Sequence, residues 1–133
     1  MQGRLRKAVI LGLLLSGCAT QRPEPPEETV ARKALERWQA LIAGDFAKAY
    51  SYYAPGYRKT VDLKSFALQK AKGVGVWLAA RVEKVACPEK DRCTARVWVK
   101  TRFFHPRVGK LETESPVEER WIYRSGKWWY VPP

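Results

Sequence analysis

The sequence predicts an α+β fold in which three N-terminal helices pack on a curved antiparallel sheet of about four strands. From Thr29 to about residue 72, apolar residues recur at three- and four-residue spacing, which is the period of amphipathic helices. After Gly75 the pattern changes to runs rich in Val, Trp and Phe, which favour strands. Helices followed by strands, without alternation, indicate a segregated α+β architecture.

The chain opens with a segment typical of protein export. Met1 to Lys7 is basic, residues 8–15 form an eight-residue apolar run, and Ser16 and Gly17 follow. A membrane-spanning helix needs about 20 apolar residues, so this run is too short to cross a bilayer. It has the length of a signal-peptide core, and we expect residues 1–17 to be an export signal.

The end of this segment, Leu15-Ser16-Gly17-Cys18, resembles the lipobox of bacterial lipoproteins. The resemblance implies that Cys18 is the first mature residue and carries lipid, and two or more acyl chains anchor a protein firmly. Because Ala19 and not aspartate follows, it also implies sorting to the inner leaflet of the outer membrane, facing the periplasm. The alternative is an ordinary cleaved signal followed by an unmodified cysteine.

Residues 18–28 are expected to join the lipidated cysteine to a single domain over residues 29–133. Ala19 to Glu28 is rich in Pro and Glu and lacks apolar periodicity, which predicts a semi-extended tether. From Thr29 a helix is predicted that stops at Gly44. Six apolar residues recur along it at helical spacing: Val30, Ala34, Leu35, Trp38, Leu41 and Ile42.

Two shorter helices are predicted next. Asp45 is a candidate N-cap for the first of them, and Pro55-Gly56 is expected to end it. Its apolar face would consist of Phe46, Ala49, Tyr50 and Tyr53. The other helix is predicted from Asp62, again as the capping residue, to Lys72.

The first strands are predicted over Val76–Cys87 and Thr94–Phe104, followed by a loop over His105–Lys110. If Cys18 carries lipid, Cys87 and Cys93 remain as a pair in an oxidising compartment, and they flank a polar turn. We therefore expect a disulfide that staples a hairpin. A metal or redox site is the alternative, but the spacing is not C-x-x-C and the single histidine leaves too few zinc ligands. No metal and no cofactor are expected.

The last two strands, Val117–Arg124 and Lys127–Val131, are separated by Ser125-Gly126, the length of a tight hairpin turn. Pairing across this turn gathers four aromatic residues on one side, namely Trp121, Tyr123, Trp128 and Tyr130. Either the helices cover these residues as core, or they line a partly open pocket.

The net charge is +12, and without the three basic residues of the signal it is +9, from 22 basic and 13 acidic groups. Such a charge favours anionic surfaces. Alternation places Arg96, Trp98, Lys100 and Arg102 on one side of a strand, a candidate binding face for an anionic envelope component. The alternative is a solvated outer face. Export makes a nucleic-acid partner unexpected.

Two stretches resemble nuclear transport factor 2-like domains of the cystatin-like superfold. In Trp38–Tyr50 a helix ends in Gly-Asp and the next begins with an aromatic residue and Ala-Tyr, and Trp121–Val131 is similar to that fold's last hairpin. The likeness spans Val30–Val131. It implies a sheet curled around a cone-shaped cavity capped by helices. The residues expected near the walls of that cavity are Trp38, Tyr53, Trp121 and Tyr123.

This fold carries many functions, so the resemblance alone does not assign one. Members like ketosteroid isomerase need a carboxylate base in the cavity, and of the adjacent Glu118 and Glu119 one must point inward on a strand. No catalytic triad or phosphate-binding loop accompanies them. We expect a membrane-anchored, non-catalytic binding or assembly module that contacts an anionic envelope component or an envelope protein. The alternative is a small-molecule-binding protein or a lyase/isomerase-type enzyme using the cone.

Overall fold

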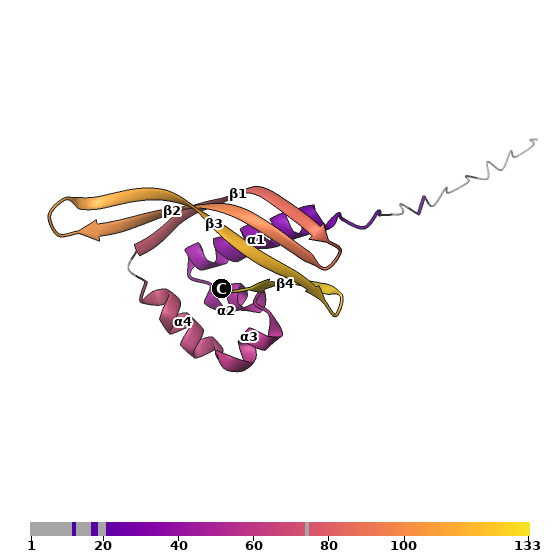
Figure 1. Cartoon of the computed structure of the whole chain (residues 1–133), viewed down its shortest axis with the longest axis horizontal. Helices are drawn as coiled ribbons and strands as arrows, with labels where there is room; N and C mark the ends of the chain where they lie inside the picture. Colours follow the sequence, from indigo (N-terminus) through magenta and orange to yellow (C-terminus); the bar gives the residue numbers. More distant parts are fainter. Residues whose placement is uncertain (1–11, 13–16, 19–20, 74) are drawn as a thin grey trace, which may run out of the picture.

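A computed structural model describes residues 12, 17, 18, 21–73 and 75–133 of the chain. Apart from Gly12 and Gly17, the predicted export signal lies outside the described residues. Figure 1 shows one curved antiparallel sheet, in the order β1-β2-β3-β4, with helices packed along one face. The predicted α+β architecture is confirmed. The helical layer contains four helices in the described residues, where three were predicted.

Helix α1 spans Pro26–Ala43 and begins three residues before the predicted start at Thr29. The last part of the predicted tether is therefore helical. Pro26 occupies the first turn, where its missing N–H costs nothing, and Glu27 and Glu28 complement the positive end of the helix dipole. The predicted stop is confirmed, because Gly44 adopts the left-handed conformation that closes the helix.

Both predicted caps are confirmed. The Asp45 side chain accepts a hydrogen bond from a backbone N–H in the first turn of α2, Phe46–Ser51. Asp62 does the same for α4, Leu63–Ala71.

Helix α3, Pro55–Thr60, was not predicted. Pro55-Gly56 was expected to end a helix, but Pro55 begins one. The proline ring fixes φ near the helical value. A backbone N–H at the first helical position has no acceptor within the helix, so its absence in proline costs nothing there, and proline suits a helix start as well as a stop.

The strands are β1 Gly75–Glu89, β2 Arg92–His105, β3 Gly109–Arg124 and β4 Lys127–Val131. The predicted loop over residues 105–110 is wrong at its ends, because β2 continues to His105 and β3 begins at Gly109, well before the predicted Val117. The added part of β3 pairs with β2 but has no helix beneath it. Its sequence therefore lacks the apolar alternation of a half-buried strand.

The final hairpin has the predicted register, with Tyr123 opposite Trp128 and Trp121 opposite Tyr130. Ser125 and Gly126 both have positive φ, which is the conformation of a type I′ turn. The chain after α2 joins the same edge, because the Ala54 N–H donates to the Tyr130 carbonyl at 2.8 Å.

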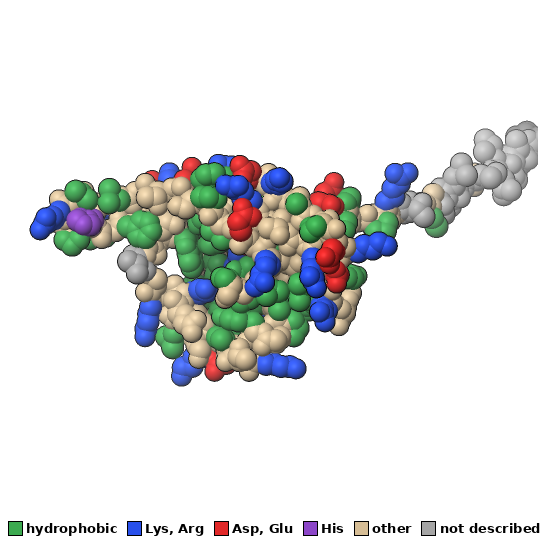
Figure 2. All heavy atoms as spheres, in the orientation of Figure 1, with side chains coloured by type: hydrophobic (Ala, Val, Ile, Leu, Met, Phe, Trp, Pro, Cys, Tyr) green, Lys and Arg blue, Asp and Glu red, His purple; other side chains and the backbone are tan. Residues whose placement is uncertain are grey.

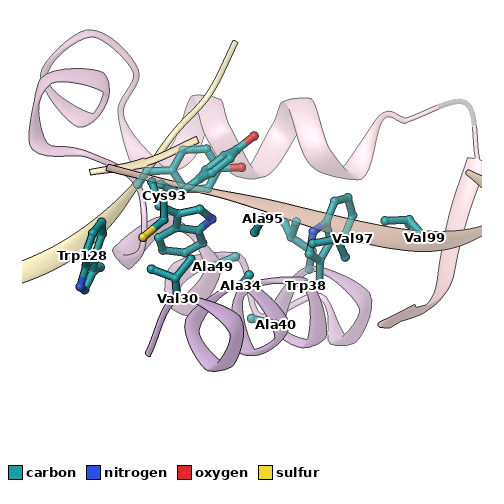
Figure 3. Packing of buried hydrophobic residues seen from close by; sticks show 14 of the residues in the cluster. Val30, Ala34, Trp38, Ala40, Ala49, Cys93, Ala95, Val97, Val99 and Trp128 are labelled. Carbon is teal, nitrogen blue, oxygen red and sulfur yellow. The ribbon is translucent and has the colours of Figure 1, made fainter. Parts of the chain in front are cut away.

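The core lies between α1 and the middle of the sheet (Figure 3). Val30, Ala34, Trp38 and Leu41 of α1 face the alternate residues of the strands. The strand residues of the core are Cys93, Ala95, Val97, Val99, Trp121, Trp128 and Tyr130. Small side chains at Ala34 and Ala95 allow the helix to approach the sheet closely.

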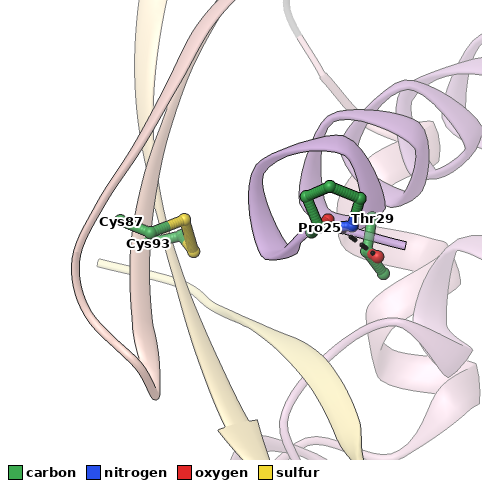
Figure 4. The surroundings of a disulfide bond; sticks show 4 residues. All are labelled: Pro25, Thr29, Cys87 and Cys93. Carbon is green, nitrogen blue, oxygen red and sulfur yellow. Dashed lines mark hydrogen bonds between the residues drawn. A yellow bond between two sulfur atoms is a disulfide. The ribbon is translucent and has the colours of Figure 1, made fainter. Parts of the chain in front are cut away.

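A disulfide joins Cys87 and Cys93, as predicted. It crosslinks β1 and β2 beside their turn, and Cys93 is buried in the core. Figure 4 shows the disulfide opposite the first turn of α1, at Pro25 and Thr29. The crosslink therefore staples the end of the sheet at which the helix begins.

Opening this crosslink should destabilise the fold modestly. Closing so short a loop contributes about 2 kcal/mol in the chain-entropy model, so Cys87→Ala/Cys93→Ala should lower the free energy of unfolding by at least that amount. Urea unfolding followed by tryptophan fluorescence measures it. Reduction of the unsubstituted protein is the matched control, because it opens the crosslink without removing the buried sulfurs. Equal stability of reduced and oxidised protein would contradict the prediction.

Candidate functional site

A buried ion pair occupies the interior between α1 and the sheet. Arg37 comes from α1 and Glu119 from β3, opposite Ala95 of β2. Their side chains are 2% and 0% exposed. Of the two adjacent acids, Glu119 therefore points inward, and Glu118 points outward toward Arg96. We call Arg37 and Glu119 the buried pair.

The Glu119 carboxylate is fully engaged by protein donors. It pairs with the Arg37 guanidinium and accepts hydrogen bonds from the indole N–H groups of Trp38, at 2.5 Å, and Trp121, at 3.1 Å. Burying a charge is costly unless it is paired and hydrogen-bonded, and these three donors meet that requirement.

Aromatic rings enclose the Arg37 guanidinium. Its central carbon lies 3.9 Å from the centroid of the Tyr130 ring and 4.9 Å from that of Trp38. One of its nitrogens donates to the Tyr53 hydroxyl at 3.2 Å. Rings at these distances attract a cation through their negative faces. Burial in this environment raises the pKa of the Tyr53 hydroxyl, which therefore stays protonated.

The residues predicted to lie near the cavity walls are found around the buried pair, where most of them form packed core. Trp38, Tyr53 and Trp121 close around the buried pair, while Tyr123 lies apart and is 43% exposed. Of the four aromatic residues predicted to share one side of the last hairpin, Trp121, Trp128 and Tyr130 are buried. Two surface pockets, of about 490 and 630 Å³, include neither member of the buried pair, although Trp121 is among the residues that line the smaller one. A general base must reach a proton of its substrate, whereas this carboxylate holds a helix to a sheet.

Arg37 was missed in the sequence because a charged residue beside Trp38 suggests a solvated position. The signal that could have found it is its spacing, three residues after Ala34 and four before Leu41, which is the buried face of the helix.

The outer face of β2 carries the predicted row Arg96, Trp98, Lys100 and Arg102, and the structure supplies carboxylates for its cations. Arg96 lies 3.1 Å from Glu83, and Lys100 and Arg102 both contact Glu112. The hydrogen bond from Arg102 lowers the pKa of Glu112, so this carboxyl stays ionised. Trp98 is covered by Arg81, whose guanidinium lies 5.2 Å from its ring centroid.

This face is therefore a set of alternating charges, in which four cations meet four acids: Arg81, Arg96, Lys100 and Arg102 with Glu83, Glu112, Glu114 and Glu118. Two of the acids, Glu112 and Glu114, lie in the part of β3 that was not predicted as a strand. Sequence reasoning therefore missed the pairing that accompanies the cations.

The third candidate surface is the end of the β2–β3 hairpin, which projects beyond the helices (Figures 1 and 2). We call residues 103–111 the hairpin tip. Its large apolar side chains are unusually open: Phe104 is 77% exposed, Val108 62%, Leu111 44% and Phe103 37%. Figure 2 shows green apolar side chains at this end of the molecule, beside a basic group and the single histidine.

Neither metal binding nor membrane crossing is indicated in the described part of the chain. No group of three or more His, Cys, Asp or Glu side chains there is arranged to hold a metal ion. None of the helices described is both long and apolar enough to cross a bilayer. Cys18, the candidate lipidation site, is exposed and lies outside the disulfide.

No protein-family model matches the chain, and no curated protein matches it. Solved structures do resemble it. A SEC-C motif containing protein from Rhodopseudomonas palustris is similar over 72% of this chain and 70% of its own, at 17% identity and a TM-score of 0.57. A ketosteroid isomerase-like protein from Erwinia carotovora atroseptica is similar over 80% and 95%, at 15% identity and a TM-score of 0.52.

A SEC-C motif containing protein from Psychrobacter arcticus is also similar, with a TM-score of 0.56 at 14% identity; the likeness covers 80% of this chain but only 60% of that protein. A putative dehydratase of the NTF2-like family from Streptomyces avermitilis has a TM-score of 0.51 at 13% identity, over 80% and 95% of the two chains. At such identities the likeness concerns the fold alone, and it supports the nuclear transport factor 2-like architecture predicted from the sequence.

Breaking the buried pair from one side should be more harmful than removing it. Arg37→Met leaves the Glu119 charge unpaired in the core and should lower the free energy of unfolding by about 3–5 kcal/mol. Arg37→Met/Glu119→Gln should recover part of this loss, because the neutral amide still accepts from an indole N–H. Chemical unfolding of the two single variants and the double variant measures the coupling. Additive losses would show that the two groups do not act as a pair.

Proposed function

We propose that this chain is a lipid-anchored module of the cell envelope that binds or assembles with another envelope component and catalyses no reaction. The observation that carries the proposal is the state of the interior. The one inward carboxylate of the final hairpin, Glu119, is fully buried and engaged by Arg37, Trp38 and Trp121. Exposed apolar side chains lie instead on the outside, and four of them, Phe103, Phe104, Val108 and Leu111, gather at the hairpin tip.

The competing function is a lyase or isomerase that uses the cone, and two of the similar structures are named for an isomerase-like protein and a putative dehydratase. Such chemistry needs a carboxylate that can approach a substrate carbon and exchange a proton with it. Reaching Glu119 in this chain would require displacing Trp38 or Trp121 and separating the buried pair. The packed interior therefore favours binding over catalysis.

The anchor part of the proposal depends on Cys18 and on the length of chain after it. Helix α1 begins at Pro26, so residues 18–25 form the link, which can extend to about 26–29 Å. We propose that this link holds the domain at the inner leaflet of the outer membrane, facing the periplasm. The Cys87–Cys93 disulfide agrees with an oxidising compartment.

Removing the anchor should release the protein. In cells that express the full chain with Cys18→Ala, no acyl chain can be attached at this position. Labelled fatty acid should therefore no longer be incorporated into the protein, and the protein should leave the membrane fraction. Metabolic labelling and fractionation measure both effects. Cys87→Ala/Cys93→Ala is the matched control and should still be labelled. Unchanged membrane association of an unlabelled Cys18→Ala protein would contradict lipid anchoring.

The outer face can be tested as a second binding surface. Arg96→Gln/Lys100→Gln/Arg102→Gln should leave stability nearly unchanged, since exposed ion pairs contribute about 0–1 kcal/mol each. If this face binds an anionic envelope component, crosslinking in cells should capture less of it, most clearly at low salt. The control Lys59→Gln/Lys64→Gln/Lys90→Gln removes three exposed cations elsewhere. Equal capture and equal salt sensitivity in both variants would count against the outer face.

A further inference from the structure

Beyond its base, where Phe103 pairs with Gly75 of β1, the hairpin tip has no strand or helix packed on it within the described chain. We propose that it inserts into the surface of an anionic lipid bilayer, an inference that rests on the proposed anchoring and adds a second point of membrane contact. Phe103 faces Leu111 across the two strands and Phe104 faces Lys110. These apolar side chains lie outside the core cluster, and the helical layer ends before it reaches them.

The shape of the tip suits insertion better than docking into a groove. β2 and β3 continue past the helices as a two-stranded ribbon closed by a short turn, so the exposed side chains form a convex end (Figure 1). Val108 lies in the turn itself and Phe104 close to it. Aromatic and aliphatic side chains at such an end can enter the headgroup region without moving the sheet.

The charges at the tip are those that an anionic surface selects. Between Phe103 and Leu111 the charged residues are Arg107 and Lys110, and the segment contains no acid. On the outer face of the same strands, Arg96, Lys100 and Arg102 each lie beside a glutamate. Positive charge therefore accompanies apolar surface here, and long basic side chains can hold their charges at lipid phosphates while the rings beside them are buried.

A second copy of the chain is a poorer occupant. Two tips would bring four cations together, from Arg107 and Lys110 of each copy, without a carboxylate between Phe103 and Leu111 to separate them. Two convex ends also bury little area against each other. An anionic bilayer meets both the charge and the shape of the tip.

The anchor and the tip can reach one membrane together. Figure 1 places the tip at the opposite end of the molecule from the start of α1. The link of residues 18–25 leaves the domain free to lie lengthwise on the bilayer, so that anchor and tip are separated along its surface. Anchoring also turns insertion into an intramolecular step, and a weak site then binds at a high effective concentration.

The test uses the lipidated full-length protein, purified and reconstituted into vesicles. With Cys18 lipidated and Cys87 paired with Cys93, Val108→Cys provides a single reactive thiol for an environment-sensitive fluorophore. In phosphatidylglycerol/phosphatidylethanolamine vesicles its emission should shift to the blue and should be quenched by spin-labelled acyl chains. In phosphatidylcholine vesicles both effects should weaken. Lys59→Cys on α3, labelled in the same way, is the matched control and should report water in both lipids.

Two further variants separate charge from apolar contact. Arg107→Gln/Lys110→Gln in the labelled protein should lower the ratio of inserted to free tip by about fivefold for each cation removed. Phe104→Ser should also lower it, whereas Leu68→Ser, an exposed leucine on α4, should not. All these positions are exposed, so the fold should survive each change, as unfolding curves will show.

Three outcomes would overturn the inference. In the first, the label at position 108 reports water in anionic vesicles just as the label at position 59 does. In the second, the emission shift of the label at position 108 grows with protein density together with energy transfer between copies, which indicates a second copy. In the third, that emission shift requires an added envelope protein. The mass of the purified protein reports lipidation separately. A protein without lipid contradicts the proposed anchoring, whereas a lipidated protein with a tip in water contradicts only the insertion.

Discussion

The buried pair is the contact on which the arrangement of the other elements depends. Arg37 and Glu119 join α1 to β3, Trp38 and Trp121 donate to the same carboxylate, and Tyr53 and Tyr130 pack on the guanidinium. Three elements, α1, β3 and β4, and the segment after α2 thus meet at one buried ion pair. Such a pair adds little stability over an apolar core of equal volume, but it leaves unpaired charge in any other packing. We infer that it selects one register of the helix on the sheet.

A helical layer fixed in this way covers only part of a long sheet. α1 packs on β1 and on the first half of β2, from Cys93 to Val99, while β2 and β3 continue beyond it. The buried pair consequently lies in packed core, and a group of exposed apolar side chains lies at the hairpin tip, outside the helical layer. The same geometry thus closes the described interior around the buried pair and leaves an uncovered end of the sheet.

Local chemistry made much of this fold predictable. Asp45 and Asp62 cap helices, Gly44 ends one, and Ser125-Gly126 sets the register of the last hairpin, because each of these roles depends on near neighbours in the chain. What escaped prediction depends on distant partners. Arg37 can be buried only because β3 supplies Glu119, and the charged first half of β3 is a strand only because β2 pairs with it. Pro55 is ambiguous on its own, since proline both ends and begins helices.

The net charge is another property whose consequence depends on partners that are distant in the chain. The excess of basic residues predicts an anionic partner but not where it binds, and the row from Arg96 to Arg102 was the natural choice in the sequence. Pairing across the sheet gives those cations carboxylates, whereas Arg107 and Lys110 have no acid in the hairpin tip itself. The tip also lies opposite the end that the disulfide staples, where α1 and the link to Cys18 begin. Under the proposed anchoring at Cys18, the uncovered, basic end of the domain is the one farthest from the anchor, so only a lengthwise orientation would bring both to one membrane.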